Sequence, residues 1–598
     1  MAADLPTTGH RLDAARARGR SVLRGVARIA WSSALLGCFG CGGPSTPVVE
    51  PTPSVPPLEA LQALCSDAAP APGVEEVVPN VFVARGYDLA NTIVVRTKAG
   101  NVVVDVGTNP TVAARVKADV AEVAPGPTVA VILTHSHVDH VGGGSAWVEP
   151  GTEVWGTRDL ADTFWDRYGV YRKIESLRAA RQFGRDVAHE DLPCSAIGSR
   201  LDVDGALSTG ARLPTKTFSG EARFVVGGTT FVLVEAPGET EDQLFVHLPD
   251  LGVLLPGDNW YHAFPNLYTI RGTRPRSVSR WIASLDAMRA REPEVLIPSH
   301  TAPVRGKESV AAALTAHRDA IQWVRDQVVR GANQGWDIDR VAAHAALPPD
   351  LAAVPSLAET YGQVDWSARA IFDAALGWFD GRVEELYPLH RSDIARRRVQ
   401  QMGGAEAVRA AVEQAISGGD HEWALVLLRD LEDAGVGEID GFVARAARGT
   451  AEDVVNTNGR GWLLQVALER EGVPSRAGAP VLDDATLDSI PAAMLVEALP
   501  SRLIPERAEG IHESIRIVFT DVELDYTLTV RNGVLEIVEG DPLPGTPASI
   551  AVARVTAGTW RRLALGRLSP AKAVASGKLK VDRALQLKRF MDRFDVSL

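Results

Sequence analysis

The chain contains 598 residues, a length that exceeds one hydrophobic core and predicts about two to four domains. Hydrophobic residues make up 45% and charged residues 23%, as in an ordinary soluble globular protein, and the formal net charge is -13. This acidity argues against nucleic acid as a partner, because phosphate binding needs a basic face. A small anionic substrate stays open, since it responds to the local field of a site.

The N-terminal segment, residues 1–38, has the composition of a bacterial export signal. Several arginines precede a short apolar stretch, Ile29 to Leu36, which is far shorter than the ~20 residues of a membrane-spanning helix. The stretch ends in Leu-Leu-Gly-Cys, which resembles a lipobox and implies that Cys38 becomes the lipidated first residue of the mature protein. An ordinary cleaved signal and a disordered arginine-rich tail are the alternatives.

Residues 39–70 contain a proline- and serine-rich stretch and are predicted to form a linker, which suits a domain held at a membrane surface. We therefore expect an exported protein, either periplasmic or anchored to the membrane through Cys38. Apart from Cys38 and Cys41 near the N-terminus, the chain has two cysteines, Cys65 and Cys194. In an exported protein these two can form a disulfide, and the alternative is two unrelated buried thiols.

The next part of the chain alternates strand-like and helical patterns. Short β-branched runs are separated by turn residues, and an all-apolar run is typical of a buried strand. Together they predict a sandwich of α and β elements. The expected strands are 81–84, 92–95, 102–106, 129–133, 222–226, 230–234 and 253–255, and the expected helices are 110–123 and 277–289.

After about residue 306 the composition changes to helix rich in alanine, arginine and glutamate. Residues 405–417 and 421–434 predict a pair of helices joined by Gly-Gly-Asp. The last part changes again, with an alternating run at 515–530, then Asn532-Gly533, the strongest short hairpin signal, and a strand at 535–538. With a helical tail at 585–594, this end of the chain predicts a small α+β domain.

The chemistry is concentrated in the run His135-Ser136-His137-Val138-Asp139-His140. Imidazole nitrogen and carboxylate oxygen are the ligands that zinc accepts in catalytic sites. Residues two apart at the end of a strand point the same way, so His135 and His137 can share one metal, while Asp139 and His140 can reach a second. Two glycines, Gly142 and Gly143, allow the backbone to lie close to the site.

This run, with the threonine before it, resembles the signature of the metallo-β-lactamase superfamily and, more narrowly, its alkylsulfatase branch (type III sulfatases). Supporting matches lie at residues 85–91, 266–272 and 376–381. The resemblance covers nearly everything after residue 75. It implies two zinc ions per subunit and a homodimer.

The resemblance also implies a three-part order of domains. An αββα catalytic sandwich is expected at residues 71–305, and a helical dimerisation domain at 306–475. A small α+β domain like sterol carrier protein 2 is expected at 476–598. Relatives of this last domain enclose hydrophobic tunnels, which favours an apolar substrate, and a structural appendage is the alternative.

The resemblance assigns a role to each metal ligand. Glutamate at position 239, where most of the superfamily has histidine, marks the alkylsulfatase branch. Aspartate at position 258 stands where the compared alkylsulfatases have glutamate, and aspartate is the usual bridge elsewhere in the superfamily. The first zinc is expected on His135, His137 and Glu239, the second on Asp139, His140 and His300, and Asp258 is expected to bridge both.

Catalysis in such a site uses a water whose pKa two zinc ions lower towards neutrality. Asp139 or Asp258 would orient that water. Asn266 and Arg271 match the pair that holds the sulfate, and a guanidinium fork suits a tetrahedral oxyanion. For Arg271 a structural salt bridge is the alternative.

Two further positions depart from the family pattern. Trp366 stands where the family has a histidine taken to assist the leaving group, and Phe183 aligns with a tyrosine that contacts sulfate. Both differences remove polar contacts to the anion.

Three functions follow. The leading hypothesis is a zinc hydrolase of sulfate esters on alkyl chains. The second is a di-zinc hydrolase of a phosphoester, lactone or carboxylic ester, which Trp366 and Phe183 favour. The third is a non-enzymatic lipid-binding lipoprotein, which the complete ligand set argues against.

Overall fold

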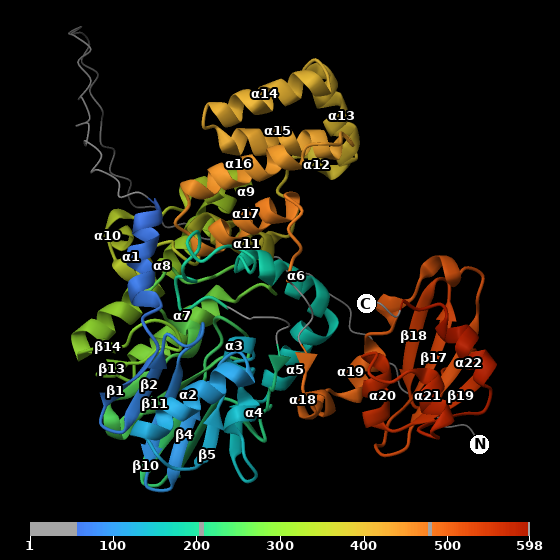
Figure 1. The fold of residues 1–598 in the computed structure, drawn as a ribbon, viewed down its shortest axis with the longest axis horizontal. Coiled ribbons are helices and arrows are strands. Elements are labelled where there is room, and N and C mark those ends of the chain that lie inside the picture. The colour runs from blue at the N-terminus through green and yellow to red at the C-terminus, as the bar shows by residue number, and fades with distance from the viewer. Residues whose placement is uncertain (1–56, 202–207, 477–480, 596–598) are drawn as a thin grey trace, which may run out of the picture. The chain divides into compact units, whose positions relative to one another are not determined.

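The computed structural model describes residues 57–201, 208–476 and 481–595. The predicted leader, with Cys38, therefore lies outside the described residues. None of the helices within these ranges combines the length and apolar character that crossing a bilayer requires. The order of the elements along the chain can be followed in Figure 1.

Two sheets form the first part of the chain. The seven-stranded sheet has the order β1-β2-β3-β4-β5-β6-β8, and the six-stranded sheet has the order β14-β13-β12-β11-β10-β9. The strands of the first sheet are β1 (Gly73–Val78), β2 (Val81–Arg85), β3 (Thr92–Thr97), β4 (Gly100–Val104), β5 (Thr128–Ile132), β6 (Glu153–Thr157) and β8 (Lys216–Phe218). Those of the second are β9 (Glu221–Val226), β10 (Thr229–Glu235), β11 (Leu244–Leu248), β12 (Val253–Leu255), β13 (Val295–Leu296) and β14 (Val304–Arg305).

The two sheets pack face to face over a core of branched side chains. Val81 and Val83 of β2 point into this core with Phe231 and Leu233 of β10, and all four are fully buried. Phe82, between the two valines, packs on the opposite face of its sheet. Because both faces are covered, such strands form continuous apolar runs, the pattern from which they were predicted.

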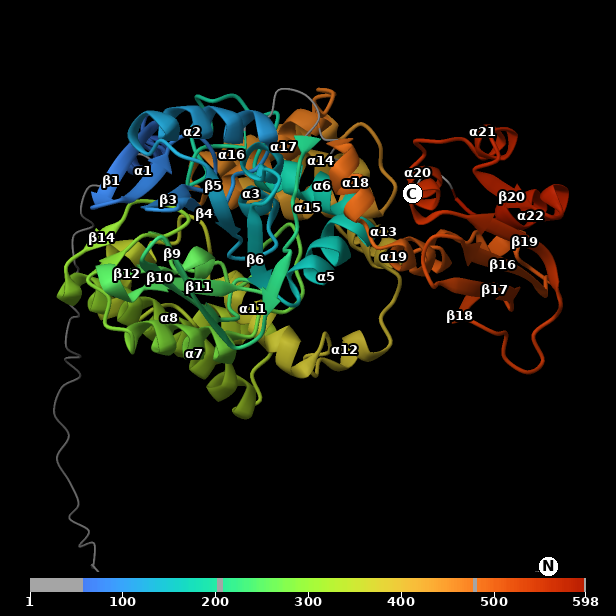
Figure 2. The same cartoon turned by 90° about the horizontal axis from the view of Figure 1, so that it is seen from below.

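Helices cover both outer faces, as Figure 2 shows for α2 on one side and α7 and α8 on the other. The bounds of these helices are Pro110–Val123, Val278–Arg289 and Lys307–Asn333. α2 begins and ends at the predicted residues, and Asn109 caps its start by accepting bonds from Thr111 N and Val112 N. The predicted αββα sandwich is confirmed.

Two predictions for this region were wrong in detail. The strand expected at 102–106 ends at Val104, because Asp105 takes a left-handed backbone conformation with φ of 59° and leaves the sheet. The predicted linker, residues 39–70, is helical at its end, where α1 runs over Pro57–Ala68. Buried Leu61 and a disulfide from Cys65 to Cys194 hold this helix to the domain.

An excursion between β6 and β8 carries short helices that border the site described below. These are α5 (Leu160–Trp165), the π-helical turn η1 (Asp166–Val170) and α6 (Arg172–Gln182). The sequence patterns did not predict them. Earlier in the chain, α3 (Val138–Val141) and α4 (Gly144–Trp147) follow β5. After α6, the short strand β7 (Ser208–Thr209) pairs with β15 (Val481–Leu482).

The central part of the chain is helical, as predicted. The predicted pair is confirmed as α14 (Ala405–Ser417) and α15 (His421–Asp433), which ends one residue earlier than expected. Their apolar faces share one core cluster. The other helices are α9 (Ile338–His344), α10 (Pro349–Ala352), α11 (Val364–Leu376), α12 (Val383–Leu386), α13 (Arg391–Gln401), α16 (Asp440–Glu452) and α17 (Thr457–Arg470).

The last part is an α+β domain with its own apolar core. Its sheet has the order β18-β17-β16-β19-β20. The alternating run at 515–530 is two antiparallel strands, not one, because the chain turns after Phe519. The predicted hairpin at Asn532 and Gly533 is confirmed, since both take positive φ between β17 and β18. The elements are α18 (Asp484–Ser489), α19 (Ala492–Glu497), β16 (Glu513–Phe519), β17 (Asp525–Arg531), β18 (Val534–Glu539), β19 (Ser549–Val555), α20 (Ala557–Ala564), α21 (Pro570–Ala575), β20 (Leu579–Val581) and α22 (Ala584–Met591).

Candidate metal centre

The metal-ligand residues predicted from the sequence come together where several strands end. His135 and His137 follow β5, and α3 carries Asp139 and His140. Three further residues arrive from the second sheet, after β10, β12 and β13. They are Glu239, Asp258 and His300.

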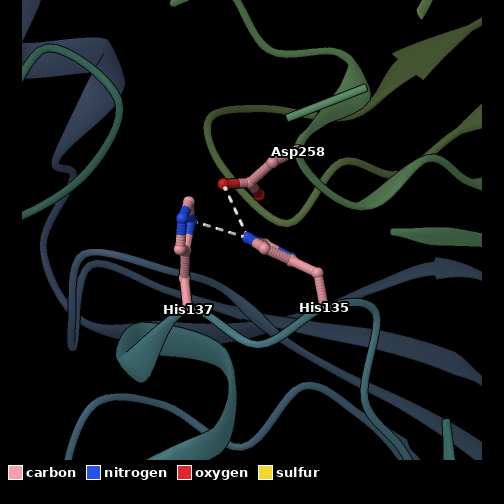
Figure 3. A group of neighbouring side chains, drawn as sticks. All are labelled: His135, His137 and Asp258. Atoms are coloured by element: carbon pink, nitrogen blue, oxygen red, sulfur yellow. Dashed lines mark hydrogen bonds and ion pairs between the residues drawn. The ribbon is translucent and has the colours of Figure 1, made fainter. Parts of the chain in front are cut away.

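The first cluster is formed by His135, His137 and Asp258, which point at one another in Figure 3. The Nε2 atom of His135 lies 2.9 Å from Nδ1 of His137 and 3.6 Å from Oδ2 of Asp258. Burial lowers the pKa of His135 to about 3 and holds that of His137 well below its usual value. Two buried neutral imidazoles therefore converge on one point beside a carboxylate.

The second cluster is formed by Asp139, His140 and His300. The Oδ2 atom of Asp139 lies 3.4 Å from Nε2 of His140 and 3.6 Å from Nε2 of His300. All three residues are buried, and both imidazoles are fully enclosed. Its ligand atoms all lie within 4.8 Å of one another.

Asp258 reaches both clusters. Besides its contact to His135, its Oδ2 lies 3.1 Å from Nε2 of His300, and its Oδ1 lies 3.4 Å from Nε2 of His140. Burial alone would raise the pKa of Asp258, but the charges of His140 and His300 outweigh it and hold the pKa well below its usual range. Asp258 therefore contacts residues of both clusters, and its bridging of two metal ions stays a prediction.

Unpaired polar atoms support a metal at this place. Nε2 of His140 and Oδ1 of Asp258 are buried and find no hydrogen-bond partner among the described residues. Leaving such groups unsatisfied costs about 1–3 kcal/mol each, so a buried pair calls for an unseen partner. Imidazole and carboxylate form the ligand set of catalytic zinc, and the residues fit two metal ions.

Glu239 stands at the edge of the first cluster. Its Oε1 lies 3.8 Å from Nδ1 of His137, while Arg276 donates a hydrogen bond to its Oε2. Burial raises the pKa of Glu239, and the Arg276 guanidinium opposes that rise. One oxygen is thereby free to act as the third ligand of the first metal.

An outer set of partners fixes the imidazoles. Asp105 Oδ2 lies 2.7 Å from Nδ1 of His140 and also accepts a 2.7 Å bond from Ser299 Oγ. The carbonyl of Leu89 accepts from Nδ1 of His300 at 2.9 Å. Such contacts set which ring nitrogen faces the metal. The sequence reasoning missed Asp105, although an acid after a buried β-branched run was its signal.

The glycines after the histidine motif are required by close approach. A Cβ at Gly142 would lie 1.8 Å from the carbonyl oxygen of Thr108, and one at Gly143 would lie 2.0 Å from that of Val106. These distances are impossible for a side chain. The prediction that the two glycines let the backbone lie close beside the site is consistent with this packing.

A cavity of about 90 Å³ opens directly beside the metal clusters. Phe183, Tyr168, Tyr361 and Arg271 line it together with both ligand clusters. A larger cavity of about 570 Å³ shares Arg271 with it and leads outward. The arrangement places a guanidinium between the metal clusters and the outer cavity.

The wall of these cavities is fixed from the helical domain. Trp462 of α17 lies beneath two guanidinium groups of α6, at 5.5 Å from Arg178 and 5.8 Å from Arg181. Arg181 also forms a 2.7 Å ion pair with Glu469. The helical domain therefore contributes to the site by holding α6.

Comparison with known proteins covers most of the chain. A metallo-beta-lactamase superfamily model matches residues 85–300, an alkyl sulfatase dimerisation model matches 337–472, and an alkyl sulfatase C-terminal model matches 481–597. A linear primary-alkylsulfatase from a Pseudomonas strain is 31% identical over 520 residues, which span 83% of this chain and 97% of that protein. The chain belongs to the alkylsulfatase family.

Other members of the alkylsulfatase family are similar to this chain over most of its length. An (R)-specific secondary-alkylsulfatase from Pseudomonas sp. is 28% identical over 530 residues, covering 85% of this chain and 79% of that protein. The solved structure of the stereoselective inverting sec-alkylsulfatase Pisa1 from Pseudomonas sp. matches with a TM-score of 0.80 at 26% identity, over 88% of this chain and 84% of that one. The family and the three-part fold predicted from the sequence are confirmed.

The substrate contacts expected from the alkylsulfatase resemblance divide into three cases. Arg271 and Phe183 line the inner cavity, 6.0 Å from guanidinium carbon to ring centre. Asn266 is buried, and its side-chain amide has no partner among the described residues. Trp366 is not among the described residues that line the cavity. Its ring packs beside Gly459, and Tyr361 lines the cavity instead.

Several cavity residues were missed by the sequence reasoning, among them Arg167, Tyr168 and Glu175. The first two belong to η1 and the third to α6. No motif surrounds them, and charged residues on a short helix ordinarily lie on a solvated face. Only the geometry identifies them as part of the site.

Proposed function

We propose that this member of the alkylsulfatase family binds two zinc ions and hydrolyses sulfate esters of alkyl chains. The observation that supports it is the pair of ligand clusters joined by Asp258, beside a cavity that Arg271 borders. Bound zinc supplies Lewis acidity and a water whose pKa is lowered to about 7. His135, His137 and Glu239 would hold one ion, and Asp139, His140 and His300 the other.

The protein groups have separable roles. The carboxylate of Asp139 or Asp258 would accept a hydrogen bond from the attacking water and orient it. Arg271 binds the sulfate, because a guanidinium is permanently charged and donates in a planar fork. Phe183 and Tyr361 offer apolar surface to the carbon chain that enters the cavity.

The test is a panel of esters on one alkyl chain, assayed with protein whose zinc content has been measured. We expect about two zinc ions per chain and turnover of the sulfate ester. Turnover of the phosphate or carboxylic ester, with none of the sulfate, would contradict the proposal. It would favour the second hypothesis, a di-zinc hydrolase of another ester. Phe183, at the position of the family tyrosine, is the observation that favours hydrolysis of another ester.

We further propose that the protein is exported and functions as a homodimer. The Cys65–Cys194 disulfide supports an oxidising compartment, and the dimerisation model over residues 337–472 supports the dimer. Cys38 is the proposed lipid anchor. Replacement of Cys38 by serine should release the protein from membranes, and light scattering should give the mass of two chains. Unsubstituted protein found free of membranes would contradict the lipid anchor. The mass of one chain would contradict the homodimer.

A further inference from the structure

A second arginine lines the outer cavity and contacts the first metal cluster. Arg167 lies in the π-helical turn η1 and lines the outer cavity together with Arg271. Its Nη1 lies 2.5 Å from Nε2 of His137, and its Nη2 donates a 3.1 Å bond to the carbonyl of Gly272. The guanidinium is therefore positioned from the backbone on one side and touches the first metal cluster on the other.

One carboxylate holds this arginine beside Arg271. The Oε1 atom of Glu175 lies 3.3 Å from Nε of Arg167 and 3.1 Å from Nε of Arg271. Arg271 also donates from Nη1 to Thr269 Oγ1 at 2.8 Å. Its Nη2 has no hydrogen-bond partner among the residues that the structure describes. Both guanidinium groups are thus aligned through Glu175 while donors stay available.

The charges at this place do not balance. Glu175 is one negative charge between two guanidinium groups, and the nearby Arg276 is already paired with Glu239. The side chains of Arg167, Arg271 and Glu175 are 15%, 8% and 11% exposed, so water screens the excess positive charge poorly. An anion in the cavity would complete the balance.

Donors also become available on the metal side. An imidazole that binds a metal through Nδ1 carries its proton on Nε2 and cannot accept a hydrogen bond there. Nδ1 of His137 is the atom that faces His135, so Nε2 becomes a donor when the metal is held. Arg167 Nη1 then loses its acceptor at His137 and can turn to an anion.

We propose that Arg167 and Arg271, aligned by Glu175, form a two-guanidinium clamp for the sulfate group of the substrate. This rests on the proposed function, and it adds Arg167 as a substrate-binding residue and Glu175 as a positioning residue. Charge-assisted bonds from guanidinium to oxyanion are strong and directional. The clamp places the sulfate between the metal clusters and the outer cavity.

Inorganic sulfate tests the clamp without any turnover. Thermal shift of the zinc-loaded protein with increasing sulfate gives a dissociation constant for wild type, Arg167→Gln, Arg167→Lys and Arg274→Gln. Arg274 is a matched control, since it is 77% exposed and paired with Asp166 outside the clamp. We expect sulfate binding about 10- to 100-fold weaker in Arg167→Gln, partly restored in Arg167→Lys, and unchanged in the control.

Zinc per chain is measured on the same samples, so that binding is expressed per loaded molecule. Unchanged sulfate affinity in loaded Arg167→Gln would overturn the clamp and leave Arg167 as a support of His137. If the wild type binds sulfate but hydrolyses no sulfate ester, the proposed function fails while the clamp still stands or falls by this comparison.

Glu175→Gln separates alignment from simple charge. If Glu175 only cancels positive charge, the substitution strengthens sulfate binding, because a competing negative charge is gone. If Glu175 aligns the two guanidinium groups, binding weakens and the KM for an alkyl sulfate rises more than kcat falls. Tighter binding would contradict the positioning role.

Discussion

The metal ligands leave the ends of strands, whereas the clamp residues Arg167 and Glu175 come from short helices inserted between β6 and β8. Strand ends are fixed by two sheets packed over a common core, so ligands that follow them need only the right residue type. The inserted helices are held by tertiary contacts such as Trp462 of α17. The two sheets therefore position the predicted metal ligands, and the helices inserted between β6 and β8 position the proposed substrate-binding residues.

The largest effect is expected at Asp258, the residue shared by both metal clusters. Asp258→Ala removes the carboxylate that contacts both clusters, through His135 in the first and through His140 and His300 in the second. We expect a fall in kcat of at least about 1,000-fold, or ~4 kcal/mol, with fewer than two zinc ions per chain. Metal analysis and kinetics on one sample check this. Two retained zinc ions with near-normal kcat would show that Asp258 is no bridge.

A smaller effect, on KM, is expected at Arg271, which lines the inner cavity. Arg271→Gln should raise the KM for an alkyl sulfate about 10- to 100-fold, because a charge-assisted bond of roughly 1.5–3 kcal/mol is lost. Zinc content should stay at the wild-type value. If the zinc content falls in parallel with activity, the division between metal clusters and wall is wrong.

The sequence predicted the metal ligands better than the residues of the cavity wall. His135, His137, Asp139 and His140 lie in one six-residue run, and their chemistry could be inferred without any fold. Glu239, Asp258 and His300 are scattered, so only the family resemblance joined them. They meet in space because β10, β12 and β13 end beside β5.

The wall could not be predicted in the same way. Trp366 was expected in the substrate site by position along the chain, but α11 turns its ring towards Gly459. Tyr361, five residues earlier, lines the cavity instead. Arg167 and Glu175 lack any motif, and their roles depend on how α6 packs on α17. Packing of this kind is a property of the folded chain and has no local signature.

A histidine outside the site shows that burial alone does not make a metal ligand. His317 of α8 is fully buried, and its Nε2 donates to the carbonyl of Ala263 at 3.2 Å. Burial lowers the pKa of His317 to about 3, whereas an unfolded chain has ~6.5. Between these values the unfolded state binds a proton that the folded state excludes, so stability falls as pH falls below about 6.5.

The expected size is about 2 kcal/mol between pH 6.5 and pH 5.0, or ~1.4 kcal/mol per pH unit. Denaturant unfolding followed by tryptophan fluorescence at several pH values measures it. His317→Asn should reduce that pH dependence relative to wild type, whatever its effect on absolute stability. An identical pH dependence in both proteins would show that His317 does not titrate on unfolding.

The smallest effect is expected at Trp366. Because the ring lies away from the cavity, Trp366→His should change KM by less than about two-fold, within the ±0.5 kcal/mol of ordinary substitutions. Phe183→Tyr, which adds a hydroxyl inside the cavity, serves as the companion variant and should alter KM. A large gain in sulfate turnover from Trp366→His alone would place that residue in the site.

The proposed function requires two metal ions that share Asp258 and act on a sulfate ester held beside them. Its most direct test is to remove metal with a chelator and to titrate zinc back while measuring alkyl sulfate hydrolysis. We expect no activity without metal and full activity at about two zinc ions per chain. Full activity of the metal-free protein, or saturation at one ion per chain, would contradict it.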